Sequence, residues 1–165
     1  MSDAHKVFGD TDSDEQKGYE REARLQYDQD VVRESQDNWG GYTASQQAFI
    51  KEQGNQIYQE LMEALKAGHA ANSAEVKEIL TRWHEHLRYF YEPSLDLLRG
   101  LGQLYNSDPR FMANFQKLHA DLPAFLEEAI EVYVDELETA AIQALLDADE
   151  DNDADVDERV NRLIQ

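Results

Sequence analysis

Aromatic and histidine side chains gather in one stretch of this 165-residue chain, from Trp83 to Phe111. Its two histidines, His84 and His86, are of a type found in metal sites and in general acid–base catalysis. On a helix, however, residues two apart point about 160° away from one another, so this pair cannot bind one ion. What remains is the chemistry of aromatic rings, which stack on flat ligands and hydrogen-bond through their polar atoms.

The residues that would support a catalytic histidine are missing. Such a histidine needs a nucleophile and a carboxylate that orients it. Glu85 is adjacent to both histidines and therefore off their faces, and no Gly-x-Ser-x-Gly turn occurs. The chain has no cysteine, which excludes disulfides, thiolate metal sites and a cysteine nucleophile. We expect no catalytic residue, no enzyme activity, no metal and no cofactor, and we place His86 in a hydrogen bond near a ligand pocket.

The charge of the chain restricts its partners. The formal net charge is −20, from 35 acidic and 15 basic residues, and such a surface repels nucleic acid, so we expect no direct contact with it. No apolar run approaches the ~20 residues of a membrane span, and the N-terminus lacks the pattern of a signal peptide. We therefore expect a cytoplasmic protein that does not contact a membrane. Solubility or a salt-adapted host explains the acidity, with attraction of cationic ligands as the alternative.

The densest acidic run is D-A-D-E-D-N-D-A-D-V-D-E, at residues 147–158. Acidic residues occupy positions 1, 3, 5, 7, 9 and 12 of this run, as in an EF-hand calcium loop. Asn152 stands where that loop needs a glycine for its sharp turn, and no second hand is present to pair with it. The pattern favours a solvated acidic tail over residues 147–165, with a calcium loop as the alternative.

Elsewhere, apolar residues recur at helical period with no sustained alternation of strand type. This predicts an all-α fold of about five to seven helices. The expected helices span residues 14–27, 28–36, 43–66, 73–90, 94–105, 109–119 and 121–146. Helix starts are indicated by capping residues: Thr43 with Gln46, Ser73, Ser94, and Asp108 before Pro109. Phe49 and Ile50 are expected to begin the buried stripe of helix 43–66, and Gly68 to cap its end.

One stretch, R-Y-F-Y-E-P-S-L-D-L-L-R-G-L-G-Q-L-Y-N-S-D-P-R-F, resembles the TipA-type antibiotic-recognition domain. That domain is the ligand-binding half of some regulators with a MerR-like DNA-binding half. The resemblance covers roughly residues 6–137 and rests on the order and spacing of several motifs. These are Phe8, Tyr19–Glu20, Glu34–Ser35, His86, Phe90–Tyr91, Pro93–Ser94, Leu101–Tyr105, Asp108–Arg110–Phe111 and residues 122–130. It implies an irregular, globin-like helical bundle with a cleft for large, flat, aromatic or peptidic antibiotics.

Three features depart from the family pattern. Gln26–Tyr27 stands where the family often has Trp-Gly, which occurs here only at Trp39–Gly40. The founding members capture dehydroamino-acid antibiotics through a cysteine, so its absence here implies non-covalent binding. No helix-turn-helix is present, so the chain resembles a stand-alone recognition domain or one excised from a longer regulator. A DNA-binding partner and a homodimer both remain open.

Apolar content and charge divide the chain into three expected parts, and the resemblance implies that the first of them closes over the ligand. Residues 1–42 are expected to form a mobile segment with short helices that closes over the ligand, residues 43–146 a helical ligand-binding core, and residues 147–165 an acidic tail. The expected ligand-binding residues are Tyr27, Trp39, Tyr42, Trp83, His86, Tyr89, Tyr91, Tyr105 and Phe111. Their helical spacing leaves core packing as the alternative for Trp83, Phe90, Phe111 and Phe115. The alternative function is an acidic helical interaction domain without a small-molecule pocket.

Overall fold

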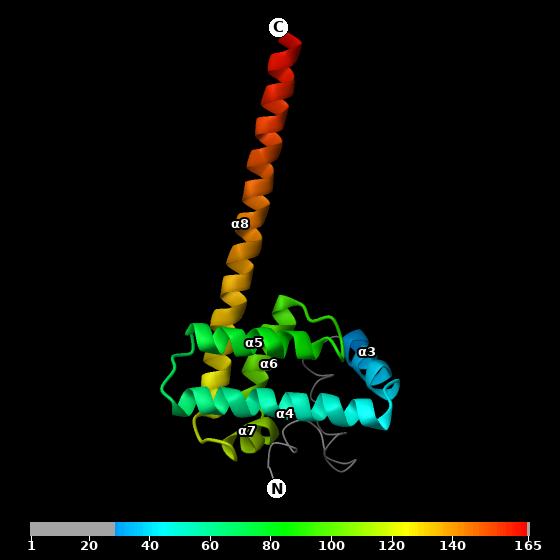
Figure 1. The fold of residues 1–165 in the computed structure, drawn as a ribbon, viewed down its shortest axis with the longest axis vertical. Coiled ribbons are helices and arrows are strands. Elements are labelled where there is room, and N and C mark those ends of the chain that lie inside the picture. The colour runs from blue at the N-terminus through cyan, green and yellow to red at the C-terminus, as the bar shows by residue number, and fades with distance from the viewer. Residues whose placement is uncertain (1–28, 165) are drawn as a thin grey trace.

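The structure, a computed structural model, describes residues 29–164, apart from the side chains of residues 153–155. These residues form α3 (Gln29–Gly40), α4 (Ala44–Lys66), α5 (Ala74–Leu87), α6 (Leu95–Tyr105), α7 (Pro109–Gln116) and α8 (Leu122–Ile164). No strand occurs among the described residues, so the prediction of an all-α fold is confirmed for them. α3 to α7 are grouped around one end of α8, which projects far beyond them (Figure 1).

The helices begin where the capping residues predict. Thr43 and Gln46 form a capping box, in which each side chain accepts a hydrogen bond from the other residue's backbone N–H, at 3.1 and 2.8 Å. Ser73 and Ser94 each accept from the backbone N–H three residues later. Asp108 caps α7 by accepting from the backbone N–H of Arg110, two residues later, with a proline at the first helical position. Local side chains therefore set these four boundaries.

The end of α4 also follows from its sequence. Gly68 adopts a left-handed conformation with φ of +84°, which favours glycine because no Cβ is present. The N–H groups of His69 and Gly68 donate to the carbonyls of Ala64 and Leu65, the pattern of a Schellman motif. The chain therefore reverses tightly, and α5 returns along α4.

The expected boundary of the second helix was wrong. α3 does not end at residue 36 but continues to Gly40, so that Trp39 lies in its last turn. Asp37 and Asn38 do not break the helix, because their carbonyls accept hydrogen bonds from the N–H of Gly41. The glycine pair ends the helix, as expected, but at its second member.

The expected end of the last helix was also wrong. α8 does not stop near residue 146 but continues through the acidic run to Ile164. Residues 147–164 contain neither glycine nor proline, so no helix breaker ends it. Side-chain pairs four residues apart, Gln143 with Asp147 and Arg162 with Glu158, support the helix on its surface. A helical backbone at residue 152 is incompatible with the sharp turn of a calcium loop.

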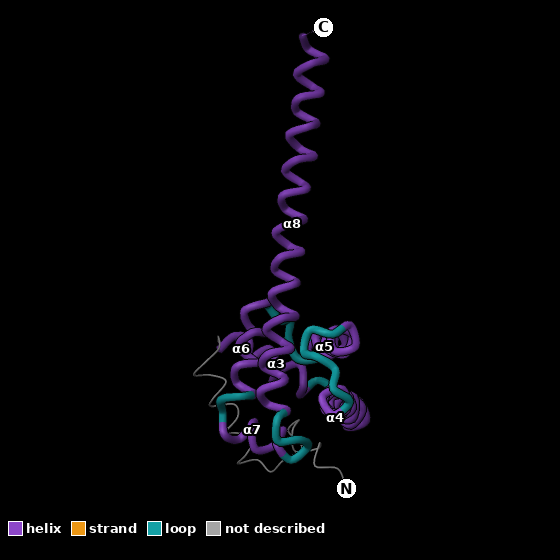
Figure 2. The backbone as a smooth tube through the Cα atoms, turned by 90° about the vertical axis from the view of Figure 1, so that its left-hand side faces the viewer, coloured by secondary structure: helices purple, strands orange, loops and turns teal. Residues whose placement is uncertain are grey.

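The core lies where the first half of α8 contacts α4, α5, α6 and α7 (Figures 1 and 2). From α8 it receives Leu122, Phe125, Leu126, Ala129, Ile130, Tyr133 and Val134. The expected stripe on α4 is correct from Ile50 onward, whose side chain is 2% exposed. Phe49 is 61% exposed, so its placement in that stripe was wrong. Adjacent residues lie about 100° apart on a helix, and at this position of α4 the face that carries Phe49 lies outside the arc that contacts the core.

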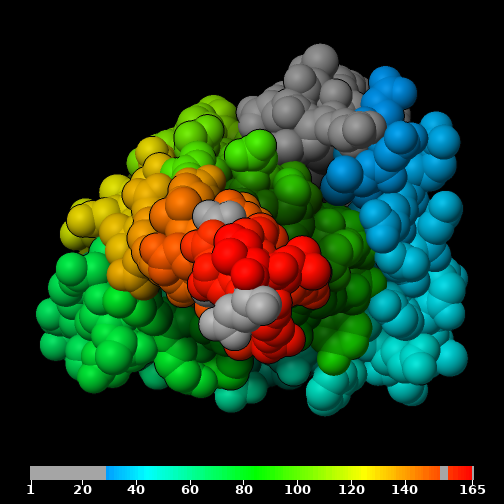
Figure 3. Space-filling model, turned by 90° about the horizontal axis from the view of Figure 1, so that it is seen from above, coloured from blue at the N-terminus to red at the C-terminus, as the bar shows by residue number. Residues whose placement is uncertain are grey.

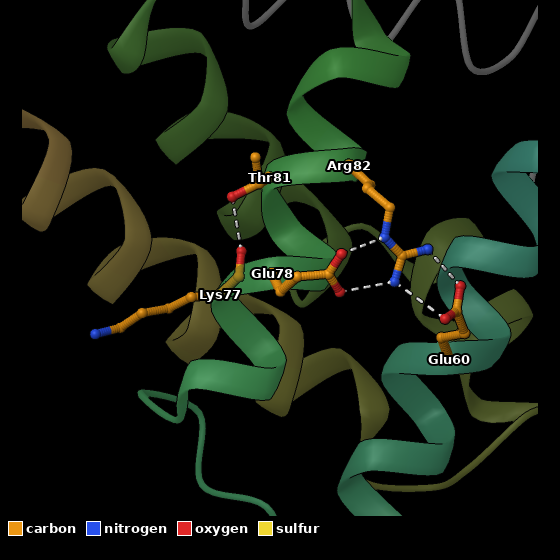
Figure 4. A network of polar contacts seen from close by, with 5 residues as sticks. All are labelled: Glu60, Lys77, Glu78, Thr81 and Arg82. Carbon is orange, nitrogen blue, oxygen red and sulfur yellow. Dashed lines mark hydrogen bonds and ion pairs between the residues drawn. The ribbon is translucent and has the colours of Figure 1, made fainter.

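Arg82 connects α4 and α5 on their outer face (Figure 4). Its guanidinium donates to both carboxylate oxygens of Glu60, at 2.7 and 3.0 Å, and to both oxygens of Glu78. The bonds to the two carboxylates raise the pKa of Arg82, and the hydrogen bond from Arg82 lowers the pKa of the Glu78 carboxyl. Because water screens exposed ion pairs, the network orients the two helices more than it stabilises them.

α6 packs against α8 through Gly102. A Cβ added at this position would lie 3.1 Å from Cβ and Cγ2 of Ile130, a residue that is only 1% exposed. We therefore expect Gly102→Val to lower the free energy of unfolding by about 1–3 kcal/mol through overpacking, measured by urea denaturation. Gly40→Val, in open space, is the matched control. If the two variants lost the same free energy of unfolding, the cause would be the backbone preference of valine and not the contact between residue 102 and Ile130.

Candidate ligand-binding site

Five rings meet where the end of α3 contacts the end of α5. Trp39, Tyr42, His86, Tyr89 and Phe90 form this group, hereafter the front cluster. Trp39 stacks on Phe90, with ring centroids 5.6 Å apart and an interplanar angle of 27°. Tyr42 meets Tyr89 edge to face at 6.3 Å, and His86 contacts Tyr89 and Phe90 at 5.6 and 5.9 Å. The front cluster thus joins two distant parts of the chain through half-buried rings above one buried histidine.

Hydrogen bonds hold the end of α3 in this position. Asn38 Nδ2 donates to the carbonyl of Phe90 at 2.7 Å, and the Tyr42 hydroxyl donates to the carbonyl of Tyr89 at 2.6 Å. α3 has no fully buried residue of its own. Among the described residues, its attachment depends on a few polar bonds and ring contacts, and a segment attached in this way separates more easily than a core helix.

Trp39 is contacted from several sides but keeps part of its surface open. Gln47 Nε2 donates to its carbonyl at 2.8 Å. Lys51 Nζ lies 5.8 Å from the centroid of its ring, within the range of a cation–π interaction. A half-exposed indole held in a fixed orientation is a suitable surface on which a flat ligand can stack.

His86 forms the base of the front cluster. Its side chain is 3% exposed, and its Nε2–H donates to the carbonyl of Ile50 at 2.8 Å. Burial lowers the pKa of the imidazole, and the bond to Ile50 opposes this in part. His84 turns instead towards α8, where its Nδ1 lies 2.9 Å from the Tyr133 hydroxyl. The expectation that the two histidines face apart is confirmed, and so is the hydrogen bond expected of His86.

The buried, neutral His86 predicts a loss of stability in acid. The pKa of His86 in the folded chain lies below the ordinary 6.5. As the pH falls below 6.5, the imidazole is therefore protonated in the unfolded chain before it is protonated in the folded chain, and the unfolded state is favoured. Stability that is present above pH 6.5 is therefore lost below it. We expect urea denaturation at pH 7.5 and 5.5 to show this loss, and His86→Gln, whose amide can still donate to Ile50, to reduce it. An unchanged loss in the variant would contradict the role of His86.

A second group of rings fills the interior between α4, α5, α6 and α7. Tyr58, Trp83, Tyr105 and Phe115 are buried there, and half-buried Phe111 packs against them; these five rings form the core cluster. Tyr105 lies 5.0 Å from Phe115 and 5.7 Å from Phe111 between ring centroids. Trp83 Nε1–H donates to the Tyr58 hydroxyl at 3.3 Å, and the Tyr58 and Tyr105 hydroxyls are 3.1 Å apart. Burial raises the pKa of both tyrosines, so they remain neutral members of a packed core.

The structure divides the expected binding residues between the two clusters. Trp39, Tyr42, His86 and Tyr89 come together in the front cluster. Trp83, Tyr105 and Phe111 lie in the core cluster, in keeping with the packing alternative for Trp83 and Phe111. Tyr91 is half-buried against the core, and Tyr27 lies outside the described residues. The helical spacing of Phe90 favours core packing, but its ring is half-buried and stacks on Trp39 in the front cluster. No local pattern points to Asn38 or Lys51, because their contacts depend on pairings across the fold.

α3 also borders a small hollow. Its described lining residues are Gln29, Val32, Arg33 and Gln36, which share one face of the helix. Trp39 is the next residue along that face, so the hollow and the front cluster are continuous on α3. The hollow measures about 190 Å³, below the ~300–1,000 Å³ typical of sites for drug-sized ligands. It has room for part of a bulky ligand.

Residues 19–133 match the family model of the TipAS antibiotic-recognition domain, over most of the chain. The chain belongs to this family. A solved structure of TipAS from Streptomyces lividans in complex with nosiheptide has the same fold, with a TM-score of 0.67 and 24% identity over 79% of this chain and 90% of that chain. The helical bundle expected from the resemblance is therefore confirmed. The TipAS family is a ligand-binding regulatory family, not an enzyme family.

Curated relatives of this TipAS-family chain are transcriptional regulators. It is similar to the HTH-type transcriptional activator mta of Bacillus subtilis, with 31% identity over 74% of this chain and 48% of the relative. It is similar to the activator TipA of Streptomyces coelicolor, with 27% identity over 76% and 49%. The chain thus spans about half the length of the curated relatives that it matches. Among the described residues, none of the helices is both long and apolar enough to span a membrane.

Proposed function

We propose that this chain binds bulky, ring-rich antibiotics, thiopeptides first among them, without a covalent bond. The observation that carries the proposal is the front cluster, where half-exposed rings stand beside the α3 hollow in a chain of the antibiotic-recognition family. The structural neighbour was solved with nosiheptide, which makes this thiopeptide the first probe. Binding is non-covalent because the chain has no cysteine to act as the nucleophile.

The contacts proposed follow from the two clusters. Trp39, Tyr42 and Tyr89 offer ring surface, each stacked pair contributing ~0.5–1.5 kcal/mol beyond burial. His86 holds the rings from below, and Tyr27 and Tyr91 remain proposed contacts. Trp83, Tyr105 and Phe111 act from the core as the rigid wall of the site. The chain has no catalytic role in this proposal.

We further propose that residues 1–42 close over the ligand, that residues 43–146 form the core that receives it, and that residues 147–165 form an acidic extension. The weak attachment of α3 supports the first part, since α3 docks through few bonds and buries no residue fully. Because the relatives are HTH-type transcriptional regulators, we propose drug-dependent transcription as the output, in the cytoplasm, through a DNA-binding segment in cis or trans.

Titration of the full chain with nosiheptide tests the proposal. Calorimetry should show saturable heat, and tryptophan emission should change as the ligand covers Trp39. Trp39→Phe is the matched variant, because it retains Trp83 in the core and should lose most of the emission change. The mass of the denatured protein should be unchanged after incubation. Absence of heat with nosiheptide and with a second thiopeptide would overturn the proposal, and an adduct would overturn its non-covalent part.

A further inference from the structure

The second half of α8 has no packing partner among the described residues. The last buried residue of α8 is Val134, Leu137 still packs against the core, and from Thr139 to Ile164 every described side chain is exposed. This projecting half, residues 139–164, is about 39 Å long at 1.5 Å per residue. It extends away from the body in Figure 1 and stands over it in the end-on view of Figure 3.

Large apolar side chains are concentrated on the projecting half. It carries seven of the eight exposed large hydrophobics among the described residues: Ile142, Leu145, Leu146, Val156, Val160, Leu163 and Ile164. At about 100° per residue, all seven fall within one arc of about 100°. Ile142, Leu145 and Leu146 form a first apolar group, and Val160, Leu163 and Ile164 repeat its spacing about five helical turns later. Because five turns return to the same side of a straight helix, the two groups lie in line. This apolar stripe is the pattern of a helix that packs against another helix.

The charge around the stripe indicates what kind of partner fits. The projecting half contains eight acidic residues and two basic ones, Arg159 and Arg162, for a net charge of −6. Asp149 lies on the stripe between its two apolar groups, and Glu150 and Asp157 lie along one edge. A partner that covers the stripe must therefore bring cations to these three carboxylates.

A second copy of this chain does not meet that requirement. Parallel pairing places Asp149 against Asp149, and antiparallel pairing about the middle of the stripe places Asp149 against Asp157. Both arrangements set like charges together, in a chain whose net charge is already −20. Residues 1–28, with eight acidic and four basic residues, are also net acidic. Neither a second copy nor residues 1–28 therefore supplies the complementary charge.

We propose that the projecting half of α8 is a docking surface for a basic amphipathic helix of a partner protein. Apolar residues of that helix would cover the stripe, and its lysines and arginines would face Asp149, Glu150 and Asp157. Apolar burial supplies the affinity, while the charges set register and exclude self-pairing. The surface is separate from the drug site, because the family match ends at residue 133, before the projecting half begins.

The probe is a labelled synthetic peptide of about three heptads. It carries leucine at the a and d positions of each heptad and lysine at the other positions. Its binding to the full chain is measured by fluorescence anisotropy, beside a scrambled peptide of the same composition. Leu145→Gln with Leu163→Gln removes two stripe residues at the same azimuth and should weaken binding at least about tenfold. Ala144→Gln with Asn161→Gln, off the stripe near the same ends, is the matched control and should bind within about twofold.

Three outcomes would overturn the proposal. The scrambled peptide binding as tightly as the amphipathic one would mean that charge alone drives association. Equal affinity in the stripe variant and its control would mean that the apolar residues are not covered. A dimer of the chain in sedimentation, if it is lost in the variant with Leu145→Gln and Leu163→Gln, would show that the stripe is covered by a second copy and not by a partner protein. Loss of peptide binding in the stripe variant alone would support the proposal, whatever the result with nosiheptide.

Discussion

Replacing Phe115 by alanine should lower the free energy of unfolding by about 3–5 kcal/mol, a large part of the stability of a domain of this size. Phe115 is 0% exposed, and its ring centroid lies 5.1 Å from Tyr58 and 5.0 Å from Tyr105. Removing the ring leaves a cavity that the neighbours on α4 and α6 cannot fill without disturbing the hydroxyl pair of the two tyrosines. Urea denaturation measures the loss.

The matched control for this substitution is Phe49→Ala. The same side chain is removed from a helix face that is 61% exposed, so the change in stability should stay within about 0.5–1 kcal/mol. A comparable loss in the two variants would mean that Phe115 does not lie in a tightly packed interior. The core cluster would then be open space available to a ligand, and the division between packing and binding rings would have to be redrawn.

Replacing Trp39 by alanine should weaken nosiheptide binding by about 10–100-fold, because it removes the largest ring surface of the front cluster. The stability of the core should change little, since α3 buries no residue fully. Calorimetry with the full chain measures the affinity. Trp39→Phe keeps a ring on Phe90 and should stay within a few fold of the parent. An affinity unchanged in Trp39→Ala would remove the front cluster from the site.

Local sequence signals predicted the helix starts, because capping depends on residues a few positions apart, whereas the ends of α3, α5, α7 and α8 differ from the expected ones. Thr43 with Gln46 shows this for α4, and Asp108 before a proline shows it for α7. Adjacent apolar residues were harder to place: Phe49 and Ile50 have similar hydrophobicity, and only the packing of α4 shows that Ile50 faces inward. The end of α8 was misplaced because a run of aspartates resembles a solvated tail, although it contains no residue that breaks a helix.

The site was harder to predict than the fold, because its contacts join residues far apart in the chain. Asn38 and Phe90 are 52 residues apart, and no local pattern predicts the hydrogen bond between them. Aromatic residue type alone does not separate Trp39, on the front, from Trp83, in the core. That difference depends on whether the neighbours of each ring come from a surface helix or from the packed interior.

One consequence follows from the continuity of α8. The same unbroken rod that carries Val134 in the interior also carries Leu163 at the far tip, so the bundle and the tip cannot reorient independently. A lever of about 39 Å that pivots by about 5° moves its end by about 3 Å. Small shifts of side chains around the pivot are therefore amplified at the tip.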